Sequence, residues 1–176
     1  RIASPRMLEK AQGTLLGQLA GDSLGSLVEF RTADDIAEAY PNGVRDLAPG
    51  GTWNLLAGQP TDDSEMALAL ARSICAESGF NADKVGQAYV AWGRSSPFDI
   101  GNTTSQGLAA ISRSGRANMT SQANGALMRV SPIGIANAGR PHLAAKQAAE
   151  DAALTHPNPV SIAASSAFAA AIAGGI

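Results

Sequence analysis

Cysteine and long apolar stretches are nearly absent from this sequence, and each absence excludes a class of protein. The 176 residues include a single cysteine, Cys75, which excludes an internal disulfide and a metal cluster built on cysteines. Cys75 lies in the apolar pattern of a predicted helix, so we expect a buried thiol and a reducing compartment, the cytoplasm. No run of about 18 apolar residues occurs, and residues 1–5 do not resemble a signal peptide, so we expect no membrane partner.

Neither sign of charge predominates in the sequence. The chain has 13 Lys and Arg against 15 Asp and Glu, a formal net charge of −2, and no run of basic residues. Proteins that bind a nucleic acid backbone or an anionic membrane surface carry a basic patch that attracts phosphate. The sequence therefore argues against nucleic acid as a partner.

Strand patterns are missing too, whereas helical patterns recur along the whole chain. Hydrophobic residues make up 45% of the sequence and aromatic residues 5%. Alanine is abundant in the second half, which favours closely packed helices joined by small side chains. Helix starts are predicted at Ser4-Pro5, Ser131-Pro132 and Pro159. No linker or repeat divides the chain, so we predict one all-α domain, a multi-helix bundle over residues 1–176.

A cluster of acidic and hydroxyl residues, Thr61 to Glu65, follows the helix breaker Gly58-Gln59-Pro60 and precedes a strongly helical run. Two adjacent aspartates, Asp62 and Asp63, repel each other, so a fold that holds both needs positive charge from a helix N-terminus or from a hard cation such as Mg²⁺. The same residues also fit a capping box, with Asp62 as N-cap and Glu65 three residues later. Both explanations predict a helix that starts here, so the local pattern alone does not separate them.

Four further segments place polar groups at the start of a predicted helix or at a helix break. In the first of them Asp22 lies between glycines, where hydrogen bonds between helix ends are a simpler role than chemistry. Together with the Thr61 cluster, these segments closely resemble, in chain order, the motifs of the ADP-ribosylglycohydrolase family, and within it the bacterial hydrolases of ADP-ribosylated dinitrogen reductase. The resemblance extends from about Gln12 to Ile176. The motifs are Gly-Asp-Ser-Leu-Gly-Ser-Leu-Val-Glu-Phe (21–30), Pro-Thr-Asp-Asp-Ser-Glu (60–65), Asp-Ile-Gly-Asn-Thr-Thr (99–104), Asn-Gly-Ala-Leu-Met-Arg-Val-Ser-Pro (124–132) and Leu-Thr-His-Pro-Asn-Pro (154–159).

The resemblance implies an orthogonal multi-helix bundle that holds ADP-ribose in a cleft and hydrolyses the glycosidic bond between ADP-ribose and a protein side chain, here arginine. It implies a centre of two Mg²⁺ ions, for which Mn²⁺ can substitute, with Thr61, Asp62 and Asp63 as metal ligands; hard cations prefer such oxygen ligands. It further implies that Asp63, Asp99 and Glu29 handle the proton at the scissile bond. Simpler roles for the last two are an Asx-turn at Asp99 and a solvated side chain at Glu29.

The resemblance also assigns ligand contacts to the loops 99–104 and 124–129 and to His156. Glycine permits close approach of the backbone, and helix N-termini favour anions, so amides of these loops suit a ribose or a diphosphate. A plain turn is the alternative for the first loop, and a packing or capping histidine is the alternative for His156. Arg129 could pair with phosphate, although a structural salt bridge explains it equally well. The implied substrate-binding residues are Gly101, Asn102, Thr103, Asn124, Gly125, Met128 and His156.

One motif of the family has no counterpart in these residues. The family's C-terminal Asp-x-Asp-Thr/Ser motif, which supplies further carboxylates to the same metal pair, would follow Ile176. We therefore expect the 176 residues to be the N-terminal portion of a longer domain, C-terminally truncated or cleaved, with half of the metal site and no activity by themselves. The alternative is a short paralogue that lacks the motif. Two alternatives to a Mg²⁺-dependent hydrolase stay open: a non-catalytic ADP-ribose-binding or crystallin-like structural protein of the same fold, and a hydrolase of another nucleotide-ribose substrate. The residues do not predict the oligomeric state.

Overall fold

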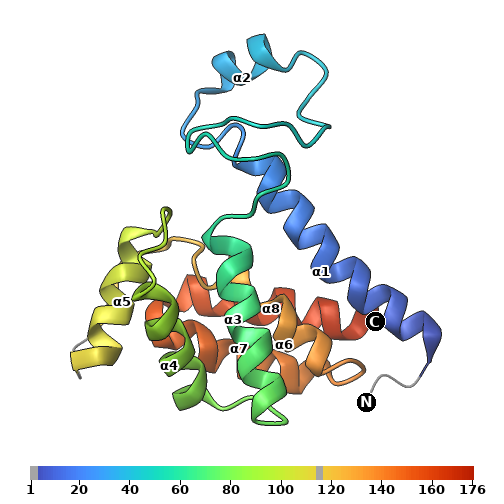
Figure 1. The fold of residues 1–176 in the computed structure, drawn as a ribbon. Helices are drawn as coiled ribbons and strands as arrows, with labels where there is room; N and C mark the ends of the chain where they lie inside the picture. Colours follow the sequence, from blue (N-terminus) through green and yellow to red (C-terminus); the bar gives the residue numbers. More distant parts are fainter. Residues whose placement is uncertain (1–3, 114–116) are drawn as a thin grey trace.

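The computed structural model describes residues 4–113 and 117–176, and nearly all of its regular structure is helical (Figure 1). In this part of the chain the only pairing between extended segments is a single antiparallel bridge between Gly50 and Leu55. The prediction of an all-α protein is therefore confirmed. In chain order the elements are α1 (Pro5–Gly25), α2 (Ala33–Ala39), α3 (Asp62–Ala76), α4 (Ala82–Gly93), α5 (Asn102–Arg113), the 3-10 turn η1 (Leu127–Arg129), α6 (Ser131–Ala136), α7 (Pro141–Thr155) and α8 (Pro159–Gly175).

The elements form two parts of unequal size (Figure 1). Helices α3 to α8 pack into one bundle, in which α7 and α8 make the most extensive contact. Helix α1 runs diagonally along one side of the bundle and contacts α3 and α6. Residues 26–60, which we call the projecting segment, extend beyond the end of α1 and carry α2 before the chain returns to the bundle at α3. Within the ranges that the structure describes, no helix combines the length and the apolar character needed to cross a membrane.

A backbone contact closes the projecting segment at its base. Gly51 has a φ of +73°, and a Cβ at this position would overlap the carbonyl oxygen of Ser26. Only glycine adopts this conformation and this close approach without displacing the backbone. Next to it, the Thr52 hydroxyl donates a hydrogen bond to the carbonyl oxygen of Glu29 over 2.6 Å. Residues 51–52 are thereby held against residues 26–29 at the start of the segment, and the backbone at Glu29 is fixed.

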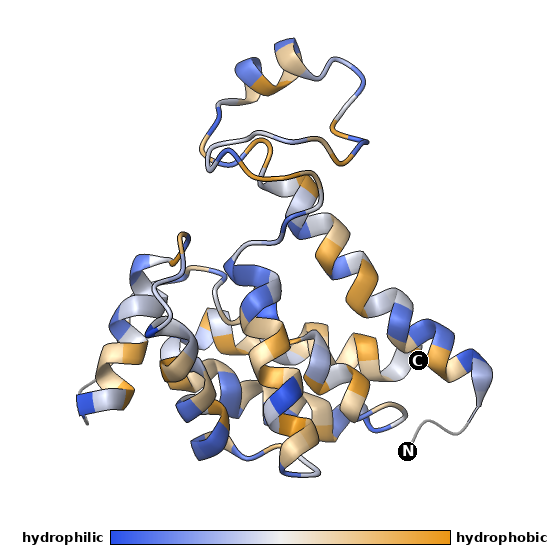
Figure 2. Ribbon diagram, viewed as in Figure 1, coloured by the Kyte–Doolittle hydropathy of each residue, from blue (hydrophilic) through white to orange (hydrophobic). Residues whose placement is uncertain are grey.

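The core lies where helices of the bundle meet, and small side chains make up much of it. Figure 2 shows hydrophobic residues along the helices of the bundle. Gly134 of α6 approaches α8 so closely that a Cβ there would lie 2.6 Å from the Cβ of Ile172. Alanines of α7 and α8 are fully buried where these two helices pack against each other. The predicted core of closely packed helices joined by small side chains is therefore confirmed. Its buried members include Met66, Leu70, Val85, Tyr89, Val130, Ile133, Ala144, Ala148, Ala169 and Ala173.

Most predicted helix starts agree with the structure. The side chain of Ser4 caps α1, and the side chain of Asn158 caps α8, which begins at Pro159. The predicted cap at Ser131 is wrong by one residue, because Ser131 is itself the first residue of α6. The cause is η1, from which the chain continues through Val130 in helical conformation directly into α6.

The prediction of a buried thiol at Cys75 is wrong, because this side chain is exposed. The buried face of α3 carries Met66, Leu70 and Ile74, which are spaced by one helical turn. Cys75 follows Ile74 directly, so its side chain is rotated by about 100° from that face.

Candidate active site

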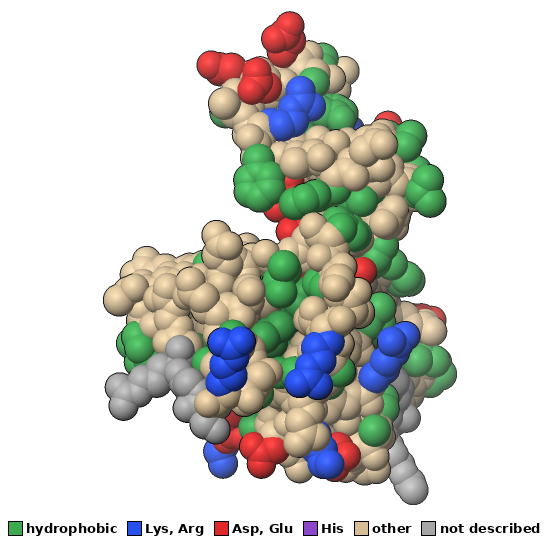
Figure 3. All heavy atoms as spheres, turned by 60° about the vertical axis from the view of Figure 1, so that its left-hand side comes forward, with side chains coloured by type: hydrophobic (Ala, Val, Ile, Leu, Met, Phe, Trp, Pro, Cys, Tyr) green, Lys and Arg blue, Asp and Glu red, His purple; other side chains and the backbone are tan. Residues whose placement is uncertain are grey.

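A cavity of about 580 Å³ lies between the projecting segment and the bundle, within the usual range of about 300–1,000 Å³ for small-molecule sites. Figure 3 shows apolar side chains around the constriction where the two parts meet, with acidic atoms between them. Every predicted site residue except Thr61 lines this cavity. The lining residues are Glu29, Phe30, Trp53, Asp62, Asp63, Phe98, Asp99, Ile100, Gly101, Asn102, Thr103, Thr104, Ala123, Asn124, Gly125, Met128 and His156.

Asp22 of α1 caps the start of α3. Its carboxylate accepts hydrogen bonds from the backbone amides of Thr61 (3.0 Å) and Ser64 (3.2 Å) and from the Thr61 hydroxyl (2.7 Å). Thr61 therefore lies behind the main cavity, in a smaller hollow of about 310 Å³ that Asp22 and Asp63 also line. Because Asp62 is the first helical residue and Asp22 supplies the acceptor, the predicted capping box with Asp62 as N-cap is wrong. The interpretation of Asp22 as a tie between helix ends is confirmed.

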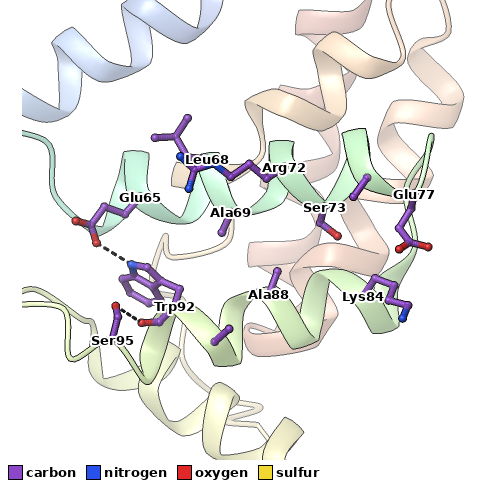
Figure 4. A pocket seen from close by; sticks show the side chains of 12 residues that line it. Glu65, Leu68, Ala69, Arg72, Ser73, Glu77, Lys84, Ala88, Trp92 and Ser95 are labelled. Atoms are coloured by element: carbon purple, nitrogen blue, oxygen red, sulfur yellow. Dashed lines mark hydrogen bonds between the residues drawn. The ribbon is translucent and has the colours of Figure 1, made fainter.

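Glu65, the other half of the predicted capping box, does not bond to the N-cap either. Its Oε2 accepts a hydrogen bond of 2.7 Å from the indole Nε1 of Trp92 in α4 (Figure 4). Both side chains line a separate groove of about 650 Å³ between α3 and α4, where Arg72 and Lys84 accompany the acidic residues. Since charges of both signs occur there, this groove lacks the unbalanced charge that distinguishes the candidate site.

Four carboxylates border the candidate cavity, those of Glu29, Asp62, Asp63 and Asp99, and no Lys or Arg is among the described residues that line it. Burial, followed by the negative charges of Asp99 and Asp63, raises the pKa of Asp62 to about 7. Burial and the charge of Asp22 raise the pKa of Asp63 to about 6. Burial and the charge of Glu29 raise the pKa of Asp99 to about 6. The cavity therefore carries negative charge that its own side chains do not balance.

A divalent cation fits the chemistry of this part of the wall, although the ligand set is incomplete. Hard cations bind carboxylate and hydroxyl oxygens, and raised pKa values at neighbouring aspartates indicate negative charge that such a cation would balance. No three Asp, Glu, His or Cys side chains in the described part of the chain are grouped closely enough to hold an ion by themselves. Thr61, Asp62 and Asp63 thus fit part of a cation site, and their role as ligands stays a prediction.

Glu29 lies at the cavity beside an aromatic group that the sequence analysis did not single out. Its Oε2 accepts a hydrogen bond of 2.8 Å from Trp53 Nε1. The Trp53 ring packs at an angle against Phe98, with centroids 5.9 Å apart, and against Phe30, with centroids 6.5 Å apart. The scarcity of aromatic residues was a usable signal, because Phe30 and Phe98 lie directly beside Glu29 and Asp99 in the sequence.

Backbone amides and hydroxyls form another part of the cavity wall. Helix α5 begins at Asn102, and the four residues 101–104 line the cavity, so the positive N-terminal end of this helix faces it. Helix N-termini attract anions. The hydroxyl oxygens of Thr103 and Ser121 lie 2.7 Å apart, which joins this start to the loop that carries Asn124. The two predicted ligand-binding loops are therefore brought together, and their role in binding stays a prediction.

His156 completes this part of the wall. Its side chain is 1% exposed, and its Nδ1 lies 2.8 Å from the Thr155 hydroxyl. Its Nε2 is buried and has no hydrogen-bond partner among the described residues. Burial, followed by the charge of Arg129, lowers the pKa of His156 to about 4. The ring is therefore neutral at physiological pH, and its Nε2 is a buried nitrogen that no described residue contacts by a hydrogen bond.

Arg129 lies inside the core and not at the cavity. Its Nε pairs with Asp151 Oδ2 at 3.0 Å, with both side chains fully buried. Its Cζ lies 4.3 Å from the centroid of the Tyr89 ring, and the Tyr89 hydroxyl donates to Asp151 Oδ1 over 2.7 Å. Of the two interpretations, the structural salt bridge is confirmed, and direct pairing of Arg129 with phosphate is wrong.

The protein is thus all-helical, with an acidic cavity of ligand size beside the starts of its helices. Comparison with known proteins identifies its family. The family model for ADP-ribosylglycohydrolase matches residues 3–176. The chain belongs to the ADP-ribosylglycohydrolase family, as the order of its motifs predicted.

Several known proteins resemble the chain. The ADP-ribosyl-[dinitrogen reductase] glycohydrolase of Rhodospirillum rubrum is 35% identical over 168 residues, which are 93% of this chain and 56% of that protein. The ADP-ribosylarginine hydrolase Tri1 of Pseudomonas putida is 32% identical over 76% of this chain and 38% of its own length. A solved structure described as an ADP-ribosylglycohydrolase-related protein complex has a TM-score of 0.76 at 28% identity, over 91% of this chain and 53% of that one. The chain thus spans about half the length of the first relative and of the solved structure.

Gly125 provides a direct test of the cavity. A Cβ at this position would lie 2.6 Å from Cε1 and 2.7 Å from Nε2 of His156, and 2.8 Å from the hydroxyl of Thr104. We expect Gly125→Ala to displace the His156 ring and to lower the free energy of unfolding by about 1–3 kcal/mol through overpacking. It should also weaken binding of ADP-ribose, the ligand that we propose for this cavity below. Thermal unfolding and calorimetric titration measure the two effects. Gly79→Ala, where a Cβ meets nothing within 4 Å, is the control; equal ADP-ribose affinity in both variants would contradict the assignment of this cavity.

Proposed function

We propose that the protein hydrolyses the glycosidic bond between ADP-ribose and an arginine side chain of a modified protein, with Mg²⁺ as cofactor. One observation carries the proposal: a single cavity combines four carboxylates with a helix N-terminus. ADP-ribose suits both, because its diphosphate pairs with N–H donors and its ribose hydroxyls pair with carboxylates and a cation. Membership of the family supports the bond that is cleaved. Cys75 is an unpaired thiol, which suits the cytoplasm as the proposed location.

The aromatic and acidic rim favours arginine as the acceptor. A guanidinium group is planar and positively charged, so carboxylates and aromatic faces both bind it. In our proposal it lies beside Glu29 and Asp99, with the rings of Trp53 and Phe98 next to them. The name of the Tri1 relative, an ADP-ribosylarginine hydrolase, supports this choice.

The proposed chemistry assigns the proton to the carboxylates at the scissile bond. Hydrolysis forms a bond between the water oxygen and ribose C1″ and breaks the bond from C1″ to the guanidine nitrogen, which takes up a proton as it leaves. Asp99, with a pKa of about 6, is mostly ionised at pH 7.5, so it can accept a proton from the water and pass it to the leaving guanidine nitrogen. Asp63 and Glu29 are the other candidates for this role. Bound Mg²⁺, held by Thr61, Asp62 and Asp63, would supply Lewis-acid chemistry toward the ribose hydroxyls and water.

A second function, binding of ADP-ribose without turnover, is favoured by one observation. The described residues contain no group of three acidic, His or Cys side chains that could hold a metal ion. A protein with the donor wall intact and an incomplete cation site would bind the nucleotide and leave the glycosidic bond uncleaved. Such a binder would have the same ADP-ribose affinity with and without Mg²⁺ in a calorimetric titration.

The hydrolase proposal is tested by incubating the protein with an arginine-ADP-ribosylated protein and measuring the free ADP-ribose that is released by chromatography. We expect release that depends on Mg²⁺, stops with a chelator, and falls at least about 100-fold when Asp62 and Asp63 are both replaced by alanine, as for the loss of a catalytic electrostatic group. Asp46→Asn, an exposed carboxylate of the projecting segment, is the matched control. Equal release by wild type and the double variant would exclude the proposed role of this site.

A further inference from the structure

A chain of hydrogen bonds leads from the core to the cavity and ends at His156. Nη1 of Arg129 donates to Thr155 Oγ1 over 3.0 Å, and Thr155 Oγ1 lies 2.8 Å from His156 Nδ1. All three side chains are at most 1% exposed. Beyond them, the ring of His156 lines the cavity, and its Nε2 is the buried nitrogen that no described residue contacts by a hydrogen bond.

The donors and acceptors of these residues fix the direction of the chain. A guanidinium group has only donors, so Thr155 Oγ1 is the acceptor of its bond to Arg129. The one hydrogen of the Thr155 hydroxyl then needs an acceptor of its own. Among the described residues, Thr155 Oγ1 has hydrogen-bond contacts only with Nη1 of Arg129, which donates, and with Nδ1 of His156 at 2.8 Å. The carbonyl oxygen of Asp151, one turn earlier in α7, instead accepts from Nη2 of Arg129 over 3.0 Å. We therefore assign the hydroxyl hydrogen to Nδ1.

The state of the imidazole ring follows from this assignment. A ring nitrogen that accepts a hydrogen bond carries no hydrogen, and a neutral imidazole has one N–H in total. Burial and the nearby charge of Arg129 lower the pKa of His156, which keeps the ring neutral. The single N–H is therefore at Nε2, at the wall of the cavity where residues 101–104 begin α5.

We propose that Thr155 is a positioning residue that holds His156 as the Nε2–H tautomer, so that the ring presents a neutral N–H donor to an oxygen atom of bound ADP-ribose. The identity of this ligand rests on the proposed function. A buried N–H without an acceptor is unfavourable, and a phosphate or ribose oxygen of the ligand supplies the acceptor. Gly125 is part of the same arrangement, because only hydrogen atoms fit between its Cα and the ring edge.

The tautomer is measured directly by nuclear magnetic resonance on protein labelled with ¹⁵N in its histidines. The chain has only two, His142 and His156, so His142→Gln assigns the signals. At pH 7.5 without ligand, we expect the Nε2 of His156 to resonate as a protonated nitrogen and Nδ1 as an unprotonated one. Thr155→Val, which removes the hydroxyl, should populate both tautomers and move the two signals toward each other, and Thr155→Ser should restore them. A protonated Nδ1 in wild type, or signals that are unchanged in Thr155→Val, would overturn the proposal.

The donor role is measured by calorimetric titration with ADP-ribose. We expect Thr155→Val to weaken binding about tenfold, the effect of one lost hydrogen bond, and Thr155→Ser to bind within about threefold of wild type. His156→Gln places an amide nitrogen near the position of Nε2 and should retain most of the affinity, whereas His156→Asn places its amide near Nδ1 and should lose it. Equal affinities of the Gln and Asn variants would contradict a donor at Nε2.

The two measurements separate this proposal from the proposed function. If wild type binds no ADP-ribose, the proposed ligand is wrong, while the ¹⁵N signals of wild type and the Thr155 variants still decide the tautomer. If ADP-ribose binds and the Nε2 signal of His156 does not shift on titration, the donor role is wrong while the binding function stands. Thermal unfolding of each variant confirms that the fold is retained before either result is compared.

Discussion

Replacing Asp151 with asparagine is expected to lower the free energy of unfolding by about 3–5 kcal/mol, the usual effect of removing one member of a buried ion pair. Asp151 pairs with Arg129 at 3.0 Å, and neither side chain is exposed. Burial raises the pKa of Tyr89 well above its ordinary value, so its hydroxyl stays protonated and donates to the same carboxylate. The variant would leave the guanidinium charge buried without a counter-charge. Denaturant unfolding of wild type and variant measures the loss.

Glu150→Gln is the matched control, since Glu150 is the neighbour of Asp151 on α7. It lies 3.9 Å from Lys146 in an exposed pair, and such surface pairs contribute at most about 1 kcal/mol. Replacing both buried partners at once, in Arg129→Met with Asp151→Leu, should recover part of the stability, because no unpaired charge then remains. A loss in Asp151→Asn no larger than that in Glu150→Gln would show that the buried pair does not stabilise the fold.

Replacing Asp62 with asparagine is expected to stabilise the metal-free protein and to abolish its response to Mg²⁺. The pKa of Asp62 in the fold, about 7, lies above the ordinary value of 3.8. Between these two values the folded state binds more protons than the unfolded state, so this group lowers stability as the pH rises. The asparagine does not ionise, so at pH 7.5 the free energy of unfolding of the variant should exceed that of wild type by about 1–3 kcal/mol. This is less than the whole pKa difference would give if it were converted to free energy. Well below pH 3.8, where this carboxyl group is protonated in both the folded and the unfolded state, the gain should vanish.

The response to Mg²⁺ should change in the opposite direction. A ligand at about 100 times its dissociation constant stabilises a protein by about 2.7 kcal/mol, so we expect the Tm of wild type to rise by about 5–10 °C with saturating Mg²⁺. The Tm of Asp62→Asn should rise by less than about 1 °C under the same conditions. Asp46→Asn should respond like wild type. If Mg²⁺ raises the Tm of Asp62→Asn as much as that of wild type, Asp62 is not a ligand.

The sequence predicted well those features that depend on neighbours along the chain. Helical patterns along the chain predicted the all-α bundle, and the abundance of alanine in the second half predicted close helix packing such as that of α7 against α8. The order of polar motifs predicted the family and the set of residues around one cavity. In each case the information lies within about four residues or in the order of short motifs, where backbone geometry is the main constraint.

Features that depend on partners far apart in the chain were missed or misassigned. Asp22 was expected to tie helix ends together, but its partner Thr61 lies 39 residues away, and the local pattern offered only a cap within Thr61 to Glu65. Glu65 accepts a hydrogen bond from Trp92, 27 residues away in the sequence, and therefore does not bond to the N-cap. Arg129 and Asp151 are 22 residues apart, and nothing in the sequence around either one indicates that they meet. Tertiary contacts of this kind override local propensity and require the folded structure to be seen.

Because the projecting segment is closed at its base, changes at its tip and changes at the cavity can occur independently as the protein evolves. Gly51 and Thr52 hold the returning part of this segment against Ser26 and Glu29, so the geometry at the cavity is set at the base. The free energy of closing a loop grows only slowly with its length. Insertions, deletions and substitutions near α2, at the far end, therefore leave Glu29 in place. The tip can diverge in sequence and length while the residues at the cavity stay the same.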